Sequence, residues 1–407
     1  MKLRITYTLA LLFATLQTFA QTYEYDANNQ LTKVTYADGS TVTYTYDELG
    51  NRLSMKKTAG IEIGYISFAD NTVKAICIEN WDEDLDGELS YDEAASVTDI
   101  GMAFSMAEIT SFDEFQYFTG VSAIPNEAFS GCNLLTSISF PSSIDRIGDL
   151  AFMGCNDLLH LTIPKSVNDI GSEAFSHCSA LESIVVEEGN STYDSRDNCN
   201  AIIYKEYNSL ILGCKNTIIP QTVEYIERYA FMQVSDLTSI TIPSSVKYIG
   251  SYAFSGCKSL RSINIPEQVT SIGSCAFFMC SSLESVYSYV QEPFRIYENT
   301  FQNWEANAST ASFTTATLYV PAGTRDAYLA TPAWDKFLNI VEMEATSQGD
   351  VNGDGSISIA DVTELVNIIL GKNLPANQSV ADINGDGSVT IADVTALVNI
   401  ILGKTGQ

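Results

Sequence analysis

The sequence predicts a mainly β solenoid built from 23-residue coils, followed by a small α-helical domain with two acidic loops. The first observation is a fixed interval: phenylalanines recur at one constant step in two sets, namely Phe129, Phe152, Phe175 and Phe231, Phe254, Phe277. The second is a motif, written IGSYAFSGCKSLRSINIPEQV at residues 249–269, whose proline recurs at the same step. The third is a doubled segment near the end of the chain, at 350–407. One unit of this length cannot bury its apolar side alone, so stacked coils must share a core.

Composition narrows the class of protein. A chain of 407 residues exceeds what one core covers, and a hydrophobic content of 45% is ample for packing. The net charge of -29 argues against binding to nucleic-acid phosphates, which requires a basic surface. An acidic chain is better suited to calcium.

The first 20 residues have the features of a cleaved signal peptide. Lys2 and Arg4 precede an apolar run from about Leu9 to Leu16, and small residues follow it up to Ala20. The run is too short for a membrane span, and no cysteine follows it to carry a lipid. We therefore expect a secreted protein, extracellular or associated with the cell surface.

Residues 21–58 are rich in tyrosine and threonine. They alternate in polarity around Asp38-Gly39, which predicts a hairpin with a tight turn. The pair Tyr25-Asp26 recurs as Tyr46-Asp47. This segment resembles the YD repeats of RHS-type secreted proteins, with about two copies, and we expect a short β-appendage without chemistry of its own.

A first metal site is predicted at residues 82–93. Acidic residues occupy positions 1, 3 and 5 of a twelve-residue loop, Gly87 provides the turn at position 6, and a glutamate ends it. The expected calcium ligands are Asp82, Asp84, Asp86, Glu88 and Glu93. An acidic turn that fits the pattern by chance is the alternative. We expect the loop to belong to a cap at residues 59–123, with a helix following it.

Within each coil we expect a strand-like piece, such as 237–243, and a return that carries an Ala-Phe pair, with the phenylalanines meeting as an internal spine. The motif A-F-x-x-C-x-x-L-x-x-I-x-I-P resembles the BspA-like leucine-rich repeat family of bacterial surface proteins, over about residues 124–304. The resemblance implies adhesion or binding at a surface, without identifying a ligand.

One coil contains an insertion, because the step from Phe175 to Phe231 is much longer than the regular interval between repeat phenylalanines. The segment from Cys199 to Cys214 reads as two strands around a loop. Either it projects as a recognition hairpin or it extends the sheet.

Five of the nine cysteines lie three positions after a repeat phenylalanine, which predicts buried thiols rather than disulfides. Cys199 and Cys214 are the one pair that a disulfide could join.

Catalysis is not predicted. His160 and His177 occupy variable positions of the repeat, and no nucleophile elbow, phosphate loop or zinc signature is present. A pair of glycosidase carboxylates is compatible with any acidic sequence, so this possibility stays open.

After the array, residues 306–345 contain a strand and a helix-like piece with Tyr328, Trp334 and Phe337, which we expect to cap the last coil.

The last segment, 346–407, contains two copies of a calcium loop, at 350–361 and 382–393, each followed by a nearly identical helix. Aspartate replaces the usual glutamate at position 12. The expected ligands of two calcium ions are Asp350, Asn352, Asp354, Ser356, Ser358 and Asp361, and Asp382, Asn384, Asp386, Ser388, Thr390 and Asp393.

This doubled loop and helix is similar to a type I dockerin, which implies a cohesin module as partner. The residues before position 12, which help to choose the cohesin, are Ile359 with Ala360 and Ile391 with Ala392, unlike the Ser-Thr pair of the well-known cellulosomal kind. The near-identity of the halves implies docking in two orientations. Four valines would lie on the presented or packed face: Val362, Val366, Val394 and Val398.

The sequence thus favours a secreted, calcium-binding, non-catalytic protein whose solenoid recognises a protein or glycan surface and whose dockerin docks to a cohesin-like partner. The alternatives are an accessory or catalytic subunit of a cellulosome-like polysaccharide-degrading complex, and a structural spacer. The expected segments are 1–20, 21–58, 59–123, 124–305 with an insertion near 190–217, 306–345 and 346–407.

Overall fold

The computed structural model describes residues 22–35, 41–46, 52–57, 61–62, 64–303, 315–343, 348–352, 356–370, 378–386 and 388–404. Contacts divide the chain into two units, one formed by residues 1–67 with 77–96 and the other by 68–76 with 97–407. The predicted signal peptide lies outside the described residues, and the expected segment boundaries stay predictions.

The first unit begins with an antiparallel sheet whose strands pair in chain order. They are β1 (Thr22–Tyr25), β2 (Leu31–Thr35), β3 (Thr41–Tyr46), β4 (Arg52–Lys57) and β5 (Ile61–Glu62). The expected hairpin is confirmed by the pairing of β2 with β3, in which Val34 lies opposite Val42. Its Asp38-Gly39 turn lies outside the described residues. Both valines are buried with Met55 in a small core.

Two helices, α1 (Asn71–Trp81) and α2 (Tyr91–Ser96), flank the predicted loop at 82–93. Just before α1, Asp70 accepts hydrogen bonds from the N–H groups of Thr72 and Val73 at 2.7 and 3.2 Å. Its other oxygen accepts from the backbone and hydroxyl of Thr110, at 2.6 and 2.7 Å. One carboxylate therefore caps a helix and joins it to the start of the solenoid.

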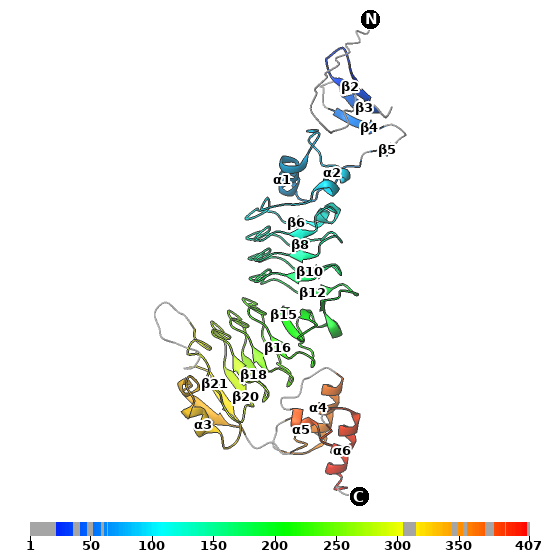
Figure 1. Ribbon diagram of the computed structural model, residues 1–407. Helices are drawn as coiled ribbons and strands as arrows, with labels where there is room; N and C mark the ends of the chain where they lie inside the picture. The colour runs from blue at the N-terminus through cyan, green and yellow to red at the C-terminus, as the bar shows by residue number, and fades with distance from the viewer. Residues whose placement is uncertain are drawn as a thin grey trace. The chain divides into compact units, whose positions relative to one another are not determined.

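The solenoid consists of coils whose strands lie side by side in parallel (Figure 1). One series of strands contains β7 (Ala123–Ile124), β9 (Arg146–Ile147), β11 (Asp169–Ile170), β16 (Tyr225–Ile226), β17 (Tyr248–Ile249) and β19 (Ser271–Ile272). The other contains β6 (Ser111–Phe112), β8 (Ser137–Ile138), β10 (His160–Ile163), β12 (Ser183–Val186), β18 (Ser262–Ile265) and β20 (Ser285–Ser288). A 3-10 helix, η2 (Asp113–Tyr117), follows β6. The predicted fold class is confirmed.

The phenylalanines form the predicted internal spine. The rings of Phe231, Phe254 and Phe277 are buried and stack with centroids 4.9 and 5.3 Å apart. Each backbone also joins the next coil: the N–H of Phe231 donates to the carbonyl of Ala253 at 2.7 Å. Alanine must precede phenylalanine because a larger side chain would have no room in this fully buried turn.

The repeat cysteines line the core as free, buried thiols, as predicted. Each Sγ lies near the carbonyl of the phenylalanine one coil earlier. Cys257 contacts Phe231 at 3.3 Å and Cys280 contacts Phe254 at 3.2 Å. The carbonyls of Phe231 and Phe254 already accept from a backbone N–H in their own turn, so the thiol adds a second, weak hydrogen bond that an alanine could not supply.

The prediction of a strand at residues 237–243 is wrong. The structure assigns none of the residues from Leu237 to Pro243 to a strand. The side-chain amide of Asn264 in the next coil accepts from the N–H of Ile242 at 2.9 Å and donates to its carbonyl at 2.7 Å. A side chain has therefore taken the backbone groups that a strand would pair.

The insertion extends the sheet, which decides between the two alternatives. It contains β13 (Tyr193–Asp194), the 3-10 helix η3 (Arg196–Asn198), β14 (Ala201–Tyr204) and β15 (Ser209–Gly213). β14 and β15 are antiparallel, and β15 continues in parallel with β16.

Cys199 and Cys214 are both free thiols, and Cys214 contacts the carbonyl of Asn200 instead, at 3.6 Å.

The aromatic residues after the array are buried at its end. This region contains β21 (Thr317–Val320), α3 (Arg325–Ala330), the 3-10 helix η5 (Trp334–Lys336) and β22 (Asn339–Glu342). β21 and β22 continue the sheet of β18 and β20 in parallel. Trp334 and Phe337 contact Phe301, the last ring of the spine, with centroids 6.1 and 5.3 Å away. Tyr328 donates from its buried hydroxyl to the carbonyl of Val290 at 2.8 Å. These residues close the core, as expected of a cap.

The C-terminal region contains α4 (Ile359–Ile369), α5 (Gln378–Ala381) and α6 (Ile391–Ile401). α4 and α6 lie against each other around a separate small core centred on Leu365 and Leu397, which are fully buried. The two predicted helices are therefore present, and a short third helix lies between them.

Truncating one ring of the spine will destabilise the solenoid. We expect Phe254→Ala to lower the free energy of unfolding by about 3–5 kcal/mol, because it leaves a cavity between two stacked rings. Leu134→Ala, at a side chain that is 46% exposed, is the control and should change stability little. Chemical denaturation followed by circular dichroism measures both. Equal effects of the two changes would contradict the role of the spine.

The cysteine thiols should be unreactive in the folded protein. Burial raises the pKa of Cys178 and of Cys280 to about 12, so both stay protonated in mildly alkaline buffer, whereas the thiolate is the form that reacts. We expect iodoacetamide to label them only after unfolding, as measured by peptide mass spectrometry. Ser281→Cys, at an exposed position of the same turn, is the positive control. Rapid native labelling of Cys280 would contradict this prediction.

Candidate metal centres

The loop at residues 382–393 folds around its own backbone N–H groups. Asp393, at position 12, accepts from the N–H groups of Asn384 and Thr390 at 3.1 and 2.8 Å. Asp382, at position 1, accepts from the N–H of Asp386 at 3.1 Å, and Asp386 accepts from that of Ser388 at 2.9 Å. The side-chain oxygens are thereby turned toward the inside of one short loop.

The loop at 350–361 repeats this arrangement where the structure describes it. Asp361 accepts from the N–H of Asn352 at 3.0 Å and from that of Ser358 at 2.7 Å. Asp361 and Asp393 are fully buried, and each completes a capping box at the start of its helix with Ser358 or Thr390. Ser356 is described, whereas Asp354 lies outside the described residues.

The N-terminal loop follows the same scheme with glutamate at position 12. Glu93 accepts from the N–H of Asp84, at position 3, at 3.4 Å, and from that of Ser90, at position 9, at 2.8 Å. Asp82 accepts from the N–H of Asp86 at 3.1 Å. The carboxylate oxygens of Asp82, Asp84 and Asp86 lie within 4.8 Å of one another. Glu88 holds position 7, where a calcium loop contributes its backbone carbonyl.

One feature of this first loop was not predicted. Asp86 forms an ion pair with Arg52 of β4 at 2.6 Å and accepts from the hydroxyl of Tyr65 at 2.8 Å. The side chain of Asp86 is only 2% exposed. A guanidinium group from the N-terminal sheet therefore already balances one acid of the loop. The pattern of the loop contains no signal for this contact, because Arg52 is 34 residues away.

Electrostatics indicate where a cation is needed. Burial, reinforced by the neighbouring Asp86, Glu93 and Asp82 carboxylates, raises the pKa of Asp84 to about 6. Burial also acts to raise the pKa of Asp393, but the N–H groups of Thr390 and Asn384 hold it below its usual range. A bound cation would stabilise both arrangements: the crowded carboxylates around Asp84 and the buried, charged carboxylate of Asp393.

The donor sets fit calcium, which prefers oxygen ligands in flexible loops. In the C-terminal loops the acidic and amide oxygens at positions 1, 3 and 5 and the carboxylate at position 12 would hold the ion. In the N-terminal loop, Asp82, Asp84 and Glu93 form no ion pair among the described residues, whereas Asp86 is paired with Arg52.

The residues predicted to bind a partner lie on the surface. Ile359 is 72% exposed and Ile391 is 69% exposed, at equivalent positions at the start of α4 and α6. Ala360 and Ala392 beside them are also exposed. Val362 and Val394 pack partly against the small core, whereas Val366 and Val398 are half-buried. Exposure of an isoleucine side chain to water is unfavourable. Two such side chains at equivalent positions of a repeated segment are typical of a contact surface.

The two histidines lie in structural positions. His177 has a positive φ of 66°, and Gly154 and Gly256 have a φ of 78° at the same position of other coils; His160 lies on the exposed face of β10. Within the part of the chain that the structure describes, no helix is long and apolar enough to cross a membrane.

Coils of this length, with parallel strands and a stacked phenylalanine core, define a leucine-rich-repeat solenoid protein. The family model of the BspA type leucine rich repeat region matches six copies over residues 98–201 and 200–319, which is more than half of the chain, and this chain belongs to that family. The type I dockerin domain matches residues 348–402, and the RHS repeat matches residues 25–62. These are repeat and docking families, and no enzyme domain is among the matches. Type I dockerin domains generally bind calcium.

Similar solved structures include leucine-rich repeat proteins of bacteria. A leucine rich cell surface protein from Faecalibacterium prausnitzii is 27% identical, with a TM-score of 0.40, and the match covers 55% of this chain and 65% of that one. The pneumococcal vaccine antigen PcpA is 21% identical, with a TM-score of 0.38 and coverage of 56% and 67%. A leucine-rich repeat protein from Eubacterium ventriosum is 22% identical, with a TM-score of 0.38 and coverage of 61% and 70%. This chain therefore spans slightly less than two thirds of the first of these proteins. No curated protein matched the chain.

Calcium should order the C-terminal domain, because its ligands are brought together only in the folded loops. We expect the helical circular dichroism signal of residues 346–407 to fall when a chelator removes calcium and to return when calcium is added. The same fragment with Asp361→Ala and Asp393→Ala should show no response to calcium. A helical signal that is unchanged by the chelator would contradict the prediction.

Proposed function

We propose that this chain is a secreted, non-catalytic binding protein that attaches to a cohesin-like module in the presence of calcium. Its C-terminal domain makes the attachment, and its solenoid presents a surface that recognises a protein or a glycan. The observation that carries the proposal is the pair of exposed isoleucines, Ile359 and Ile391, each beside a loop that orients acidic oxygens inward.

Calcium and docking are linked through the capping boxes. Asp361 and Asp393 accept hydrogen bonds from the loop N–H groups and also lie in the first turn of α4 and α6. An ion held at position 12 would therefore fix the helix start on which Ile359 or Ile391 is displayed. The predicted ligands of this domain act together in this role: Asp350, Asn352, Asp354, Ser356, Ser358 and Asp361, and Asp382, Asn384, Asp386, Ser388, Thr390 and Asp393.

The N-terminal loop has a different role in this proposal. Its ion would be held by Asp82, Asp84, Asp86, the carbonyl of Glu88, and Glu93. Arg52 and Tyr65 tie the same loop to β4 and to the segment before α1. Calcium at this loop would therefore stabilise the N-terminal unit rather than bind a partner.

The module architecture also supports secretion. The predicted signal peptide at residues 1–20 precedes a YD-like sheet, a repeat solenoid and a docking domain. The matched families are repeat and docking modules, which favours binding over hydrolysis. Calcium-dependent hydrolysis of a polysaccharide by the purified chain, lost on changing one carboxylate pair, would favour the enzymatic alternative.

Docking should depend on calcium and on the loops. Surface plasmon resonance of the full chain over immobilised cohesin modules should show binding in calcium that is lost with a chelator. We expect Asp361→Ala with Asp393→Ala to weaken binding by at least about 100-fold, because the helices lose their metal-ordered starts. Asp326→Ala with Asp335→Ala removes the same charge elsewhere and is the control. Equal binding by all three proteins would contradict the docking role.

The isoleucines should be redundant if either half can dock. Ile359→Asp or Ile391→Asp alone should cost little, because the other half still offers its isoleucine. The two changes together should weaken binding by at least about tenfold, since a charge would then lie in an apolar contact in both orientations. The same surface plasmon resonance assay measures this. A double variant that binds like the unchanged chain would rule out these residues as the contact.

A further inference from the structure

One coil of the solenoid has a shortened turn. In the regular coil that follows, six residues run from Ile226 to Phe231. In the insertion coil Leu210 pairs with Ile226, and the N–H of Gly213 donates to the carbonyl of Ala230 at 2.8 Å. A repeat phenylalanine makes this bond in other coils. Gly213 therefore takes the place of a phenylalanine, and the turn before it is two residues shorter.

The glycine is required by the next ring of the spine. A Cβ atom at position 213 would lie 2.1 Å from Cε1 of Phe231, so no side chain fits. In the described part of the chain, Phe175 stacks on Phe152 alone, and Phe231 stacks on Phe254 alone. The phenylalanine spine is interrupted at this coil.

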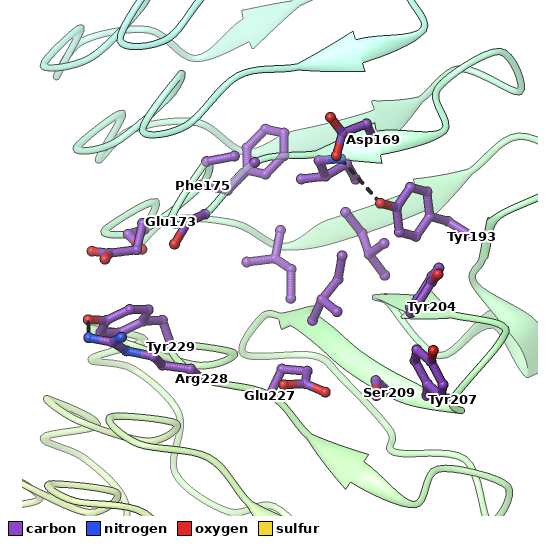
Figure 2. Close-up of a pocket in the computed structure, with 18 of the residues that line it drawn as sticks. Asp169, Glu173, Phe175, Tyr193, Tyr204, Tyr207, Ser209, Glu227, Arg228 and Tyr229 are labelled. Atoms are coloured by element: carbon purple, nitrogen blue, oxygen red, sulfur yellow. Dashed lines mark hydrogen bonds between the residues drawn. The ribbon is translucent and has the colours of Figure 1, made fainter.

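The shortened turn leaves a cavity of about 520 Å³ between the coil at 168–176 and the coil at 227–229. We call it the insertion cavity (Figure 2). Aliphatic side chains form its apolar base, including Ile202, Ile211 and Leu212. This volume is in the range of pockets that hold small molecules or sugar units.

Tyrosines form one side of the cavity. Tyr193, Tyr204 and Tyr207 follow one another there (Figure 2), with ring centroids 5.7 and 5.5 Å apart. The hydroxyl of Tyr193 accepts from the N–H of Ile170 at 3.2 Å, and that of Tyr204 donates to Glu206 at 2.7 Å. Because the Tyr204 hydroxyl already donates to Glu206, the ring faces are the main surface that this wall offers to a ligand.

The charges around the cavity are largely balanced. Asp169 forms an ion pair with Arg146 at 3.1 Å. Figure 2 shows Glu173 facing Tyr229 and Arg228, whose guanidinium group lies 4.4 Å from the ring centre of Tyr229. Among the described residues Glu227 forms no ion pair, so its carboxylate oxygens can accept hydrogen bonds from a ligand.

Two backbone donors also face the cavity. In the preceding coil, Leu150 and Phe152 donate their N–H groups to the carbonyls of Ser172 and Ala174, at 3.0 and 2.7 Å. The equivalent N–H groups, of Glu173 and Phe175, have no protein acceptor among the described residues, because the shortened turn does not reach them. A ligand that fills the cavity must accept hydrogen bonds from these groups.

The ligand must also donate hydrogen bonds, because Glu227 only accepts. A simple cation cannot accept from the two N–H groups, and an anion would be repelled by the carboxylate of Glu227, which forms no ion pair. Addition of a peptide strand is blocked, since β11 has only two residues and the hydroxyl of Tyr193 already takes the outward N–H of Ile170. A neutral carbohydrate both donates and accepts through its hydroxyls, and it places apolar C–H groups on aromatic rings.

We propose that the insertion cavity binds a neutral carbohydrate, with Tyr204 and Tyr207 stacking on a sugar ring and Glu227 accepting from its hydroxyls. This rests on the proposed function of the solenoid as a binding surface and selects a glycan from the two ligand classes left open.

Binding of the full chain to an array of neutral and charged oligosaccharides, followed by calorimetric titration with a soluble neutral oligosaccharide that binds, tests the proposal. We expect Tyr204→Ala and Glu227→Gln each to weaken binding by about tenfold, through loss of ring contact and of a charged acceptor. Leu212→Trp, which fills the base of the cavity, should abolish binding. Tyr319→Ala and Glu284→Gln are matched controls, since Tyr319 stacks on Tyr287 and Glu284 pairs with Arg261 away from the cavity.

The outcomes separate this proposal from the proposed function. Thermal unfolding confirms that each variant is folded. An array without neutral carbohydrate binding, while calcium-dependent docking persists, would overturn the cavity proposal and leave the docking role standing. Binding that is unaffected by all three cavity variants, or that is confined to charged sugars or peptides, would also overturn it.

Discussion

On either side of the insertion, regular coils are tied to one another through the same Ala-Phe pair. There the phenylalanine rings stack at about 5 Å, and the N–H of a phenylalanine such as Phe254 donates to the alanine carbonyl of the following coil. Ring stacking and backbone pairing together set one spacing for the regular coils. The other repeat positions adapt to it: cysteine supplies a small side chain whose thiol reaches the carbonyl of the phenylalanine one coil before. A solenoid held in this way gains stability coil by coil, because each contact is with a neighbour.

The same constraint explains why the insertion has a functional consequence. A coil that departs from the repeat cannot supply both a ring and the turn that carries it. Gly213 preserves the hydrogen bond to Ala230 but has no ring, and Phe231 lies against its backbone. The turn of the preceding coil, at residues 168–176, then has no matching turn to pair with. The apolar base, the tyrosines and the unpaired N–H groups are therefore left around one cavity. In a regular array this surface would be covered by the next turn. Shortening one turn is thus enough to create a site, while β15 keeps its parallel pairing with β16 on the other side.

The acidic loops at the two ends of the chain share one chemical plan. In each loop the carboxylate at position 12 accepts from the N–H groups at positions 3 and 9, whether it belongs to Asp361, Asp393 or Glu93. What differs is the surroundings. The C-terminal loops begin helices that display exposed isoleucines, whereas the N-terminal loop shares Asp86 with Arg52. A guanidinium group lowers the local negative charge without supplying an oxygen ligand, so we infer that the same plan serves docking at one end and local stability at the other.

The sequence alone determined the features that depend on the repeat interval and on residues close together in the chain. The constant step between phenylalanines predicted the solenoid and its spine, because one ring per coil must stack on the next. The doubled loops predicted Asp361 and Asp393 as calcium ligands at position 12, because the loop pattern is local, and this role stays a prediction. Features that depend on distant residues were decided only by the tertiary structure. Asn264 replaced an expected strand at 237–243 by reaching one coil back, and Arg52 reached Asp86 across 34 residues. The insertion could be located by its length, but only the register of β15 on β16 showed that Gly213 stands in a phenylalanine position. Spacing along the chain specifies a repeat, whereas the place where the repeat fails is shaped by the coils on either side of it.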